Sequence, residues 1–184
     1  PSTFIHQYIP YIHTIQQQRP QVICILSGIM ELLPIIVILI HPFAALLLIM
    51  IFMTQLKWRK KREFLKGDDL IKAHRKHISD GNKIMLATIF VIVLAFIGEI
   101  SRAIFNNLPF DSYIMPNNFH SSGGLLGLLL MIILWLTGHS TQRKKVSNQS
   151  FSKTRDTHGR IGDIMAILIL IHAFLGFLYL LQII

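Results

Sequence analysis

The chain has 184 residues, of which 52% are hydrophobic and only 15% are charged, and its mean hydropathy is +0.53. Soluble domains carry about 25% charged residues, so the composition excludes an ordinary soluble domain and predicts an integral membrane protein. The one cysteine, Cys24, excludes an intrachain disulfide and a cluster of thiolate ligands.

The basic residues are concentrated beside apolar runs. The formal net charge is +9, and sixteen of the eighteen Lys and Arg lie in two windows, Lys57–Lys83 and Arg143–Arg160. Each window flanks apolar segments, which is the pattern of the positive-inside rule and also gives some affinity for anionic lipid. We therefore interpret these clusters as signals of membrane topology, and we expect no binding of nucleic acid.

The N-terminal part of the chain predicts one element before the first span. The apolar stretch from Val22 to Met53 is too long for one simple span, and Pro34 and Pro42 interrupt it. We divide it into a half-buried interfacial helix and a first full span over 38–56. Residues 1–37 are thus expected to form an N-terminal arm and the interfacial helix. A fifth complete span in this region is the alternative.

Three further apolar runs complete a predicted four-transmembrane-helix domain over residues 38–184. Asp68 and Asp69 offer an N-cap for a helix that leads into the second span. Glu99 and Arg102, three residues apart near the end of that span, are expected to form an ion pair. The fold class is therefore all-α, an integral membrane four-helix bundle with an additional N-terminal interfacial helix. The later spans are expected over 84–104, 120–137 and 164–181, with polar connectors over 57–83 and 138–156 and a short loop over 105–119.

The last apolar run has one polar interruption, His172. His158 precedes it by fourteen residues, or about 21 Å along a helix. Each of these histidines is followed four residues later, on the same helix face, by a glycine, Gly162 or Gly176. An ionisable group at membrane depth usually serves a function. A histidine above a missing side chain leaves room for a flat ligand whose metal the imidazole can hold.

The histidines near the spans fall into two groups, one at each interface. Low-spin b-type haem takes two imidazoles from facing helices, and a neutral imidazole buries no charge beside the porphyrin. The arrangement is the one that a two-haem transmembrane electron carrier requires. One group comprises His41, His120 and His172, and the other, at the basic end, comprises His74, His77 and His158.

Three motifs resemble the core of the cytochrome b561 family. The resemblance implies that one haem b lies between His41 and His120. It implies that a second lies between His158 and either His74 or His77. The motifs are H-P at the first span (His41, Pro42), H-S-x-x-G at the third (His120, Ser121, Gly124) and H-x-x-x-G at the fourth (His158, Gly162).

The chain more closely resembles a four-helix family of unassigned function from cyanobacteria and plastids, over about residues 39–181. This resemblance implies a photosynthetic (thylakoid) membrane, with the basic loops on the stromal or cytoplasmic side. His172 has no counterpart in the two-haem core, and it either replaces His41 or His120 as a ligand or bonds to a propionate. The matching segments are His41-Pro42, His74-Arg75-Lys76, His120 with Gly124, Arg155 with His158, and His172-Ala173-Phe174-Leu175-Gly176.

Two functions remain open at this point. The first is a cytochrome b561-like carrier with one or two b-type haems. The second is a non-catalytic accessory subunit of a photosystem or similar membrane complex, ligating chlorophyll or carotenoid or nothing. The expected partners are the lipid bilayer and other subunits of a complex. Catalysis beyond redox is not indicated, because the sequence contains no nucleophile–base pair, carboxylate cluster or phosphate-binding loop.

Overall fold

The computed structural model describes residues 32, 35–113, 115–116 and 118–183. The chain divides into two compact units, Pro1–Val37 and Ile38–Ile184. The expected arm and interfacial helix lie almost entirely outside the described residues. The fold below is that of the second unit.

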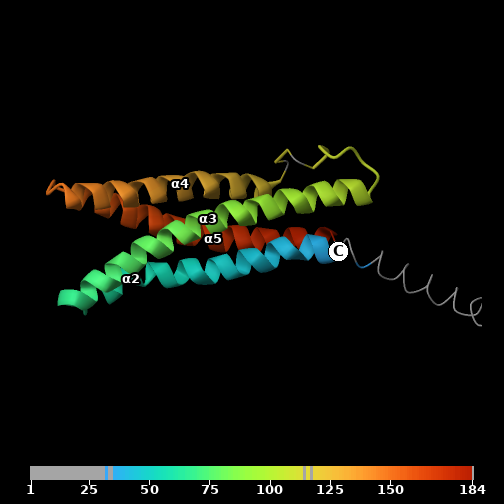
Figure 1. Ribbon diagram of the computed structural model, residues 1–184. Coiled ribbons are helices and arrows are strands. Elements are labelled where there is room, and N and C mark those ends of the chain that lie inside the picture. Colours follow the sequence, from blue (N-terminus) through green and yellow to red (C-terminus); the bar gives the residue numbers. More distant parts are fainter. Residues whose placement is uncertain (1–31, 33–34, 114, 117, 184) are drawn as a thin grey trace, which may run out of the picture. The chain divides into compact units, whose positions relative to one another are not determined.

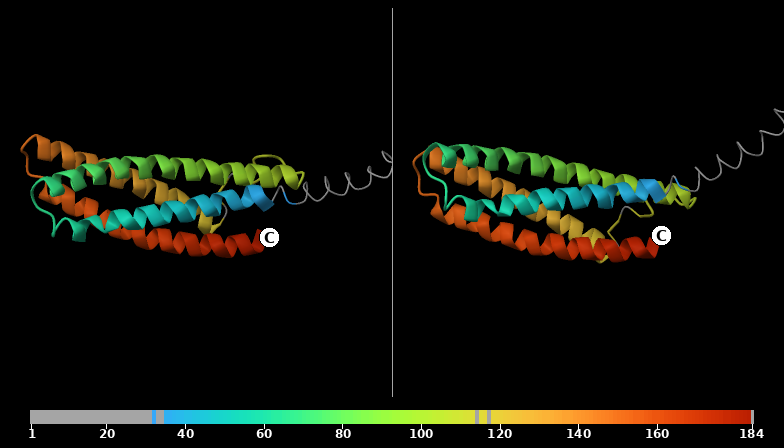
Figure 2. Two further views of the ribbon diagram at one scale, coloured as in Figure 1. Left: turned by 60° about the horizontal axis from the view of Figure 1, so that its bottom comes forward. Right: turned by 90° about the horizontal axis from the view of Figure 1, so that it is seen from below.

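Four long helices lie side by side in the second unit and alternate in direction (Figure 1). The two connections rich in basic residues lie at one end, and the 106–118 loop lies at the other in every view (Figure 2). The described residues contain no strand, which confirms the all-α prediction. In chain order, the helices are a first helix over residues 35–56, the short α2 (Trp58–Lys61), α3 (Gly67–Phe105), α4 (Phe119–Val146) and α5 (Ser152–Ile183).

Within the part of the chain that the structure describes, four helices are long and apolar enough to cross a membrane. The bounds of these candidate spans are Ile35–Lys61, Gly67–Phe105, Phe119–Val146 and Ser152–Gln182. Their outer faces are apolar, and Phe90 and Ile167 are 60% and 63% exposed. Exposed apolar surface of this kind is what a lipid environment covers. At about 1.5 Å per residue, the 39 residues of α3 exceed a hydrocarbon layer of about 30 Å, so its polar first turns extend past that layer.

The polar connector predicted over 138–156 is mostly helical, so that prediction was wrong. α4 continues to Val146 and α5 begins at Ser152, which leaves only residues 147–151 outside the helices. Basic side chains occupy the last turn of α4, where their positive charges interact favourably with the negative end of the helix dipole. Lys and Arg are also good helix formers. A polar segment beyond the bilayer therefore did not have to be a loop.

Two N-terminal predictions also require correction. α3 begins one residue after Lys66, its N-cap, so Asp68 and Asp69 occupy the first turn and do not cap it. Their negative charges still interact favourably with the positive end of the helix dipole. Pro42, which was expected to interrupt the apolar stretch, lies inside the first helix, because residues 35–41 are already helical. A proline is tolerated inside a membrane helix when its surroundings satisfy the freed backbone groups.

Asparagine ends both α3 and α4 in the same way. Asn107 and Asn148 adopt positive φ angles of 56° and 51°. The next amide donates back into the helix, from Leu108 to the Ala103 carbonyl and from Gln149 to the Lys144 carbonyl, each at 2.9 Å. This is the Schellman arrangement, which satisfies the last carbonyls and turns the chain sharply. Asparagine suits it because it tolerates the left-handed conformation.

Four buried hydrophobic residues cluster in one layer between the two ends of the bundle, apart from the buried Val91 and Ala103. One residue from each long helix forms it, namely Phe52, Ile84, Met131 and Met165. Met165 stands seven residues from His158 and seven from His172, or about 10.5 Å from each along α5. The core therefore separates the two histidine levels.

Candidate functional site: two histidine pairs at opposite ends of the bundle

A heptad of large side chains on α5 connects both ends of the bundle. His158, Met165, His172 and Tyr179 recur every seven residues, which keeps them on one side of the helix. Met165 is 2% exposed, and the other three make ring contacts inside the bundle. This face presents a histidine at each of two levels.

The loop-end cluster consists of His41, His120 and His172, from the first helix, α4 and α5. The ring centroids of His41 and His120 are 6.3 Å apart, with the planes at 72°. His120 stacks on His172 at 4.1 Å and 19°. The structure thus brings together the three histidines that the sequence assigned to this end.

Two histidines of the loop-end cluster use Nδ1 for a backbone carbonyl. His41 Nδ1 lies 3.0 Å from the Val91 oxygen of α3, and His120 Nδ1 lies 3.2 Å from the His172 oxygen. A carbonyl can only accept, so Nδ1 carries the proton and Nε2 keeps its lone pair. His172 differs, because its Nδ1 is buried without a hydrogen-bond partner in the described part of the chain.

Glycines on facing helices make the room for two of these rings. A Cβ on Gly176 would lie 2.7 Å from Cε1 of His120, so a side chain on α5 would occupy the place of the ring. A Cβ on Gly124 would lie 3.2 Å from Cε1 of His172, and one on Gly123 would lie 3.4 Å from its Nδ1. Each imidazole therefore sits over backbone that lacks a side chain.

A half-buried polar network adjoins the loop-end cluster. Arg102 donates to Glu99 at 3.1 Å, which confirms the predicted ion pair, and it also donates to the Tyr179 hydroxyl. Tyr179 donates in turn to the other Glu99 oxygen at 3.2 Å, and its ring lies 6.0 Å from that of His120. The guanidinium lies 3.8 Å from the ring of Tyr113, a residue of the 106–118 loop. The network connects that loop to the histidines.

The basic-end cluster consists of His74, His77 and His158. The ring centroids of His77 and His158 are 6.4 Å apart, with the planes at 88°. Trp58 of α2 stacks on His77 at 5.1 Å and 16°, and it lies 5.9 Å from the ring of His74. His77, and not His74, is therefore the α3 histidine that faces α5.

Hydrogen bonds orient both rings of the His77–His158 pair. Gln55 donates to the His77 carbonyl at 2.8 Å, so its Oε1, 3.1 Å from His77 Nδ1, must accept. His158 Nδ1 lies 3.0 Å from the carbonyl of Leu134 and 3.3 Å from the hydroxyl of Thr137. Both rings thus carry the proton on Nδ1 and leave Nε2 as the free lone pair.

Gly138 of α4, and not Gly162, lies against the ring of His158. A Cβ on Gly162 would meet Leu56 at 3.6 Å and Leu134 at 3.9 Å, both ordinary contacts. Gly138 of α4 provides the room, because a Cβ there would lie 3.1 Å from Cε1 of His158. The glycine that makes room for the His158 ring is therefore on the facing helix.

Sequence reasoning missed Gln55, Trp58, Gly138 and Tyr179 as parts of these clusters. The heptad that follows His158 offered a signal for Tyr179. Nothing in the sequence marked the other three, because their roles depend on which helix faces which.

Among the described residues, no group of three or more His, Cys, Asp or Glu side chains is arranged to hold a metal ion. Haem iron takes only one or two axial protein ligands, so pairs are the relevant unit. No protein-family model, curated protein or solved structure matches this chain.

Proposed function

We propose that the chain is a transmembrane electron carrier that holds two b-type haems, one between His41 and His120 and one between His77 and His158. The observation that carries the proposal is the separation within these pairs, 6.3 and 6.4 Å between ring centroids. Each pair joins alternate long helices, the first with α4 and α3 with α5.

If haem binds, the two imidazoles of each pair would hold it, and their separations suit that role. A metal–imidazole bond is about 2.0 Å long and the nitrogen lies about 1.1 Å from the ring centre, so two ligands of one metal would have centroids about 6.2 Å apart. The donor set fits as well, since each of the four rings offers Nε2 and binds an oxygen through Nδ1. Ligating histidines commonly have such an oriented second nitrogen.

Two further features support a bound group at the loop end. His172 has a buried Nδ1 with no partner among the described residues, and this atom is available to a polar group of the cofactor, such as a propionate. Gly176 leaves room for the ring of His120, which packs against the α5 backbone at a position without a side chain. Both features suit a site that is completed by a ligand.

The chain's own residues place the two proposed sites at different depths. A haem, when bound, accepts and returns one electron. The two histidine levels are about 21 Å apart along α5, with the apolar core between them. Uncharged imidazoles hold each level without placing a charge in the apolar layer. The two levels thus lie toward opposite faces of the membrane.

The choice of membrane rests on other grounds. The resemblance to the cyanobacterial and plastid family supports a photosynthetic membrane. The positive-inside rule supports a stromal or cytoplasmic position for the basic end.

The test is the haem content of the full chain, purified in mild detergent after expression with haem supply. A pyridine haemochrome assay and a reduced-minus-oxidised spectrum should give two haems per chain. His120→Ala and His158→Ala should each remove one haem. His139→Ala is the matched control, because His139 contacts Trp135 of its own helix. Its Nδ1 lies 3.0 Å from the Trp135 carbonyl oxygen, and its ring lies 4.2 Å from the Trp135 ring at a tilt of 46°.

A chain that binds no haem would refute the proposal. The accessory-subunit alternative would then remain, and pigment analysis of the isolated complex would test it.

A further inference from the structure

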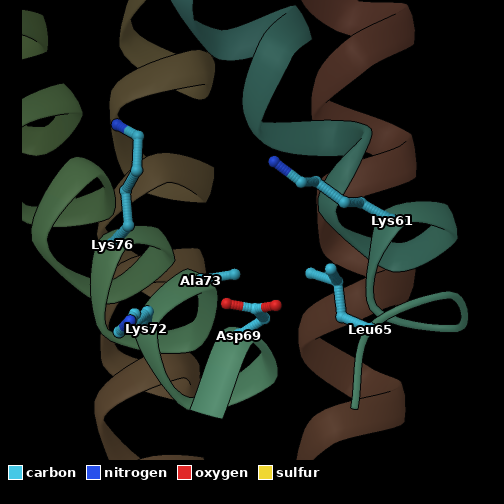
Figure 3. Close-up of a pocket in the computed structure, with 6 residues that line it drawn as sticks. All are labelled: Lys61, Leu65, Asp69, Lys72, Ala73 and Lys76. Carbon is cyan, nitrogen blue, oxygen red and sulfur yellow. The ribbon is translucent and has the colours of Figure 1, made fainter. Parts of the chain in front are cut away.

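We infer that the pocket beside α2 is a binding site for the phosphate of an anionic phospholipid. The pocket has a volume of about 310 Å³ and lies between the end of α2 and the first turns of α3 (Figure 3). The inference does not depend on haem. Its lining residues are Lys61, Leu65, Asp69, Lys72, Ala73 and Lys76.

The residues that line the pocket carry a net positive charge, which favours an anionic ligand. Three lysines and one aspartate line it, and the Asp69 carboxylate lies between Leu65 and Ala73 (Figure 3). Lys76 pairs with Asp80 at 2.7 Å, whereas Lys61 and Lys72 form no ion pair with any residue that the structure describes. Lysine binds phosphate as a point charge. The pocket therefore offers two uncommitted cations to a ligand.

The spacing of the lining residues along α3 also supports an anion-binding site. Asp69, Lys72, Ala73 and Lys76 follow the spacing i, i+3, i+4, i+7 and share one helix face. Lys72 and Lys76 are like charges at i, i+4, an arrangement that costs helix stability. Lys61 adds a third positive charge from the α2 wall (Figure 3). A bound anion would relieve this repulsion.

The position of the pocket favours a lipid over a soluble anion. Lys61 is the last residue of the first candidate span, and α3 begins at Gly67. The pocket thus lies where the chain leaves the apolar layer and turns back. Phe64 and Ile71, each next in sequence to a lining residue, are 84% and 51% exposed, so exposed apolar side chains accompany the lysines. A phospholipid matches this position, because its phosphate belongs to the headgroup, which lies outside the apolar layer, where the lysines are.

The test measures lipid retention by native mass spectrometry of the full chain in detergent, with added phosphatidylglycerol or phosphatidylcholine. We expect phosphatidylglycerol to bind preferentially. The variant Lys61→Gln/Lys72→Gln should lower that affinity about tenfold. The matched control Lys60→Gln/Lys153→Gln removes the same charge from exposed positions outside the lining and should change it less than about twofold.

Three results would overturn the inference. Equal losses in both double variants would mean diffuse attraction to the basic end. Equal retention of the two lipids would mean that charge is not recognised. Displacement of the lipid by inorganic phosphate at an equal concentration would assign the pocket to a soluble anion. Circular dichroism checks the fold of each variant, and if a double variant unfolds, Lys72→Gln compared with Lys60→Gln decides the question.

Discussion

Alanine at Gly176 and at Gly162 should have opposite consequences, although both glycines lie on α5. At position 176 the new Cβ would be 2.7 Å from Cε1 of His120, whereas ordinary contacts begin near 3.4 Å. The ring must therefore move by about 0.7 Å. It is held by its stack on His172 at 4.1 Å and by the bond to the His172 carbonyl at 3.2 Å. Metal–ligand distances tolerate only about 0.2 Å.

We therefore expect Gly176→Ala to lose the loop-end haem and to keep the other, so that the haem-to-chain ratio falls from two to one. Overpacking costs about 1–3 kcal/mol and alanine returns about 1 kcal/mol of helix propensity, so the net loss of stability is small. Cofactor content, measured by the pyridine haemochrome assay, is the sharper readout.

Gly162→Ala serves as the control for this experiment. Its Cβ would meet only Leu56 and Leu134 at ordinary distances, so we expect both haems and a melting temperature a few degrees higher. If Gly176→Ala retained two haems, or if both variants lost the same haem, the proposed seating of His120 would be refuted.

Three other changes test the remaining contacts. His77→Ala should remove the basic-end haem while His74→Ala keeps it, because only His77 faces His158; the haem content of the two variants decides, and equal losses would reject this assignment. Arg102→Gln should destabilise the chain by about 1–2 kcal/mol in thermal unfolding, because the half-buried Glu99 keeps the Tyr179 hydroxyl but loses its cationic partner. An unchanged unfolding temperature would contradict this. Gln55→Leu should weaken haem binding at the basic end about 10- to 100-fold in a titration, because the Nδ1 proton of His77 loses its acceptor, and an unchanged affinity would mean that Gln55 does not orient the ring.

The chain's helical architecture was readable from the amino-acid pattern because the bilayer imposes it. A layer about 30 Å thick demands about 20 apolar residues per helix, and four such helices are present. The axial levels of the histidines were readable as well, since a helix rises by a constant amount per residue. The Glu99–Arg102 pair was predictable for a similar reason, because three residues along a helix place two side chains side by side. The residues at which α4 ends and α5 begins could not be predicted from the sequence, because the lipid layer constrains only the apolar segments.

Contacts between helices were decided by the tertiary structure alone. His74 and His77 lie on similar faces of α3, so spacing could not choose between them, and the packing against α5 brings His77 to His158. Local spacing paired each histidine with a glycine on its own helix, yet His158 sits over Gly138 and His120 over Gly176, each on the facing helix. The rotation and shift of one helix against another depend on how side chains interlock across the interface. The amino-acid sequence of one chain does not by itself predict the rotation and shift of its helices against one another.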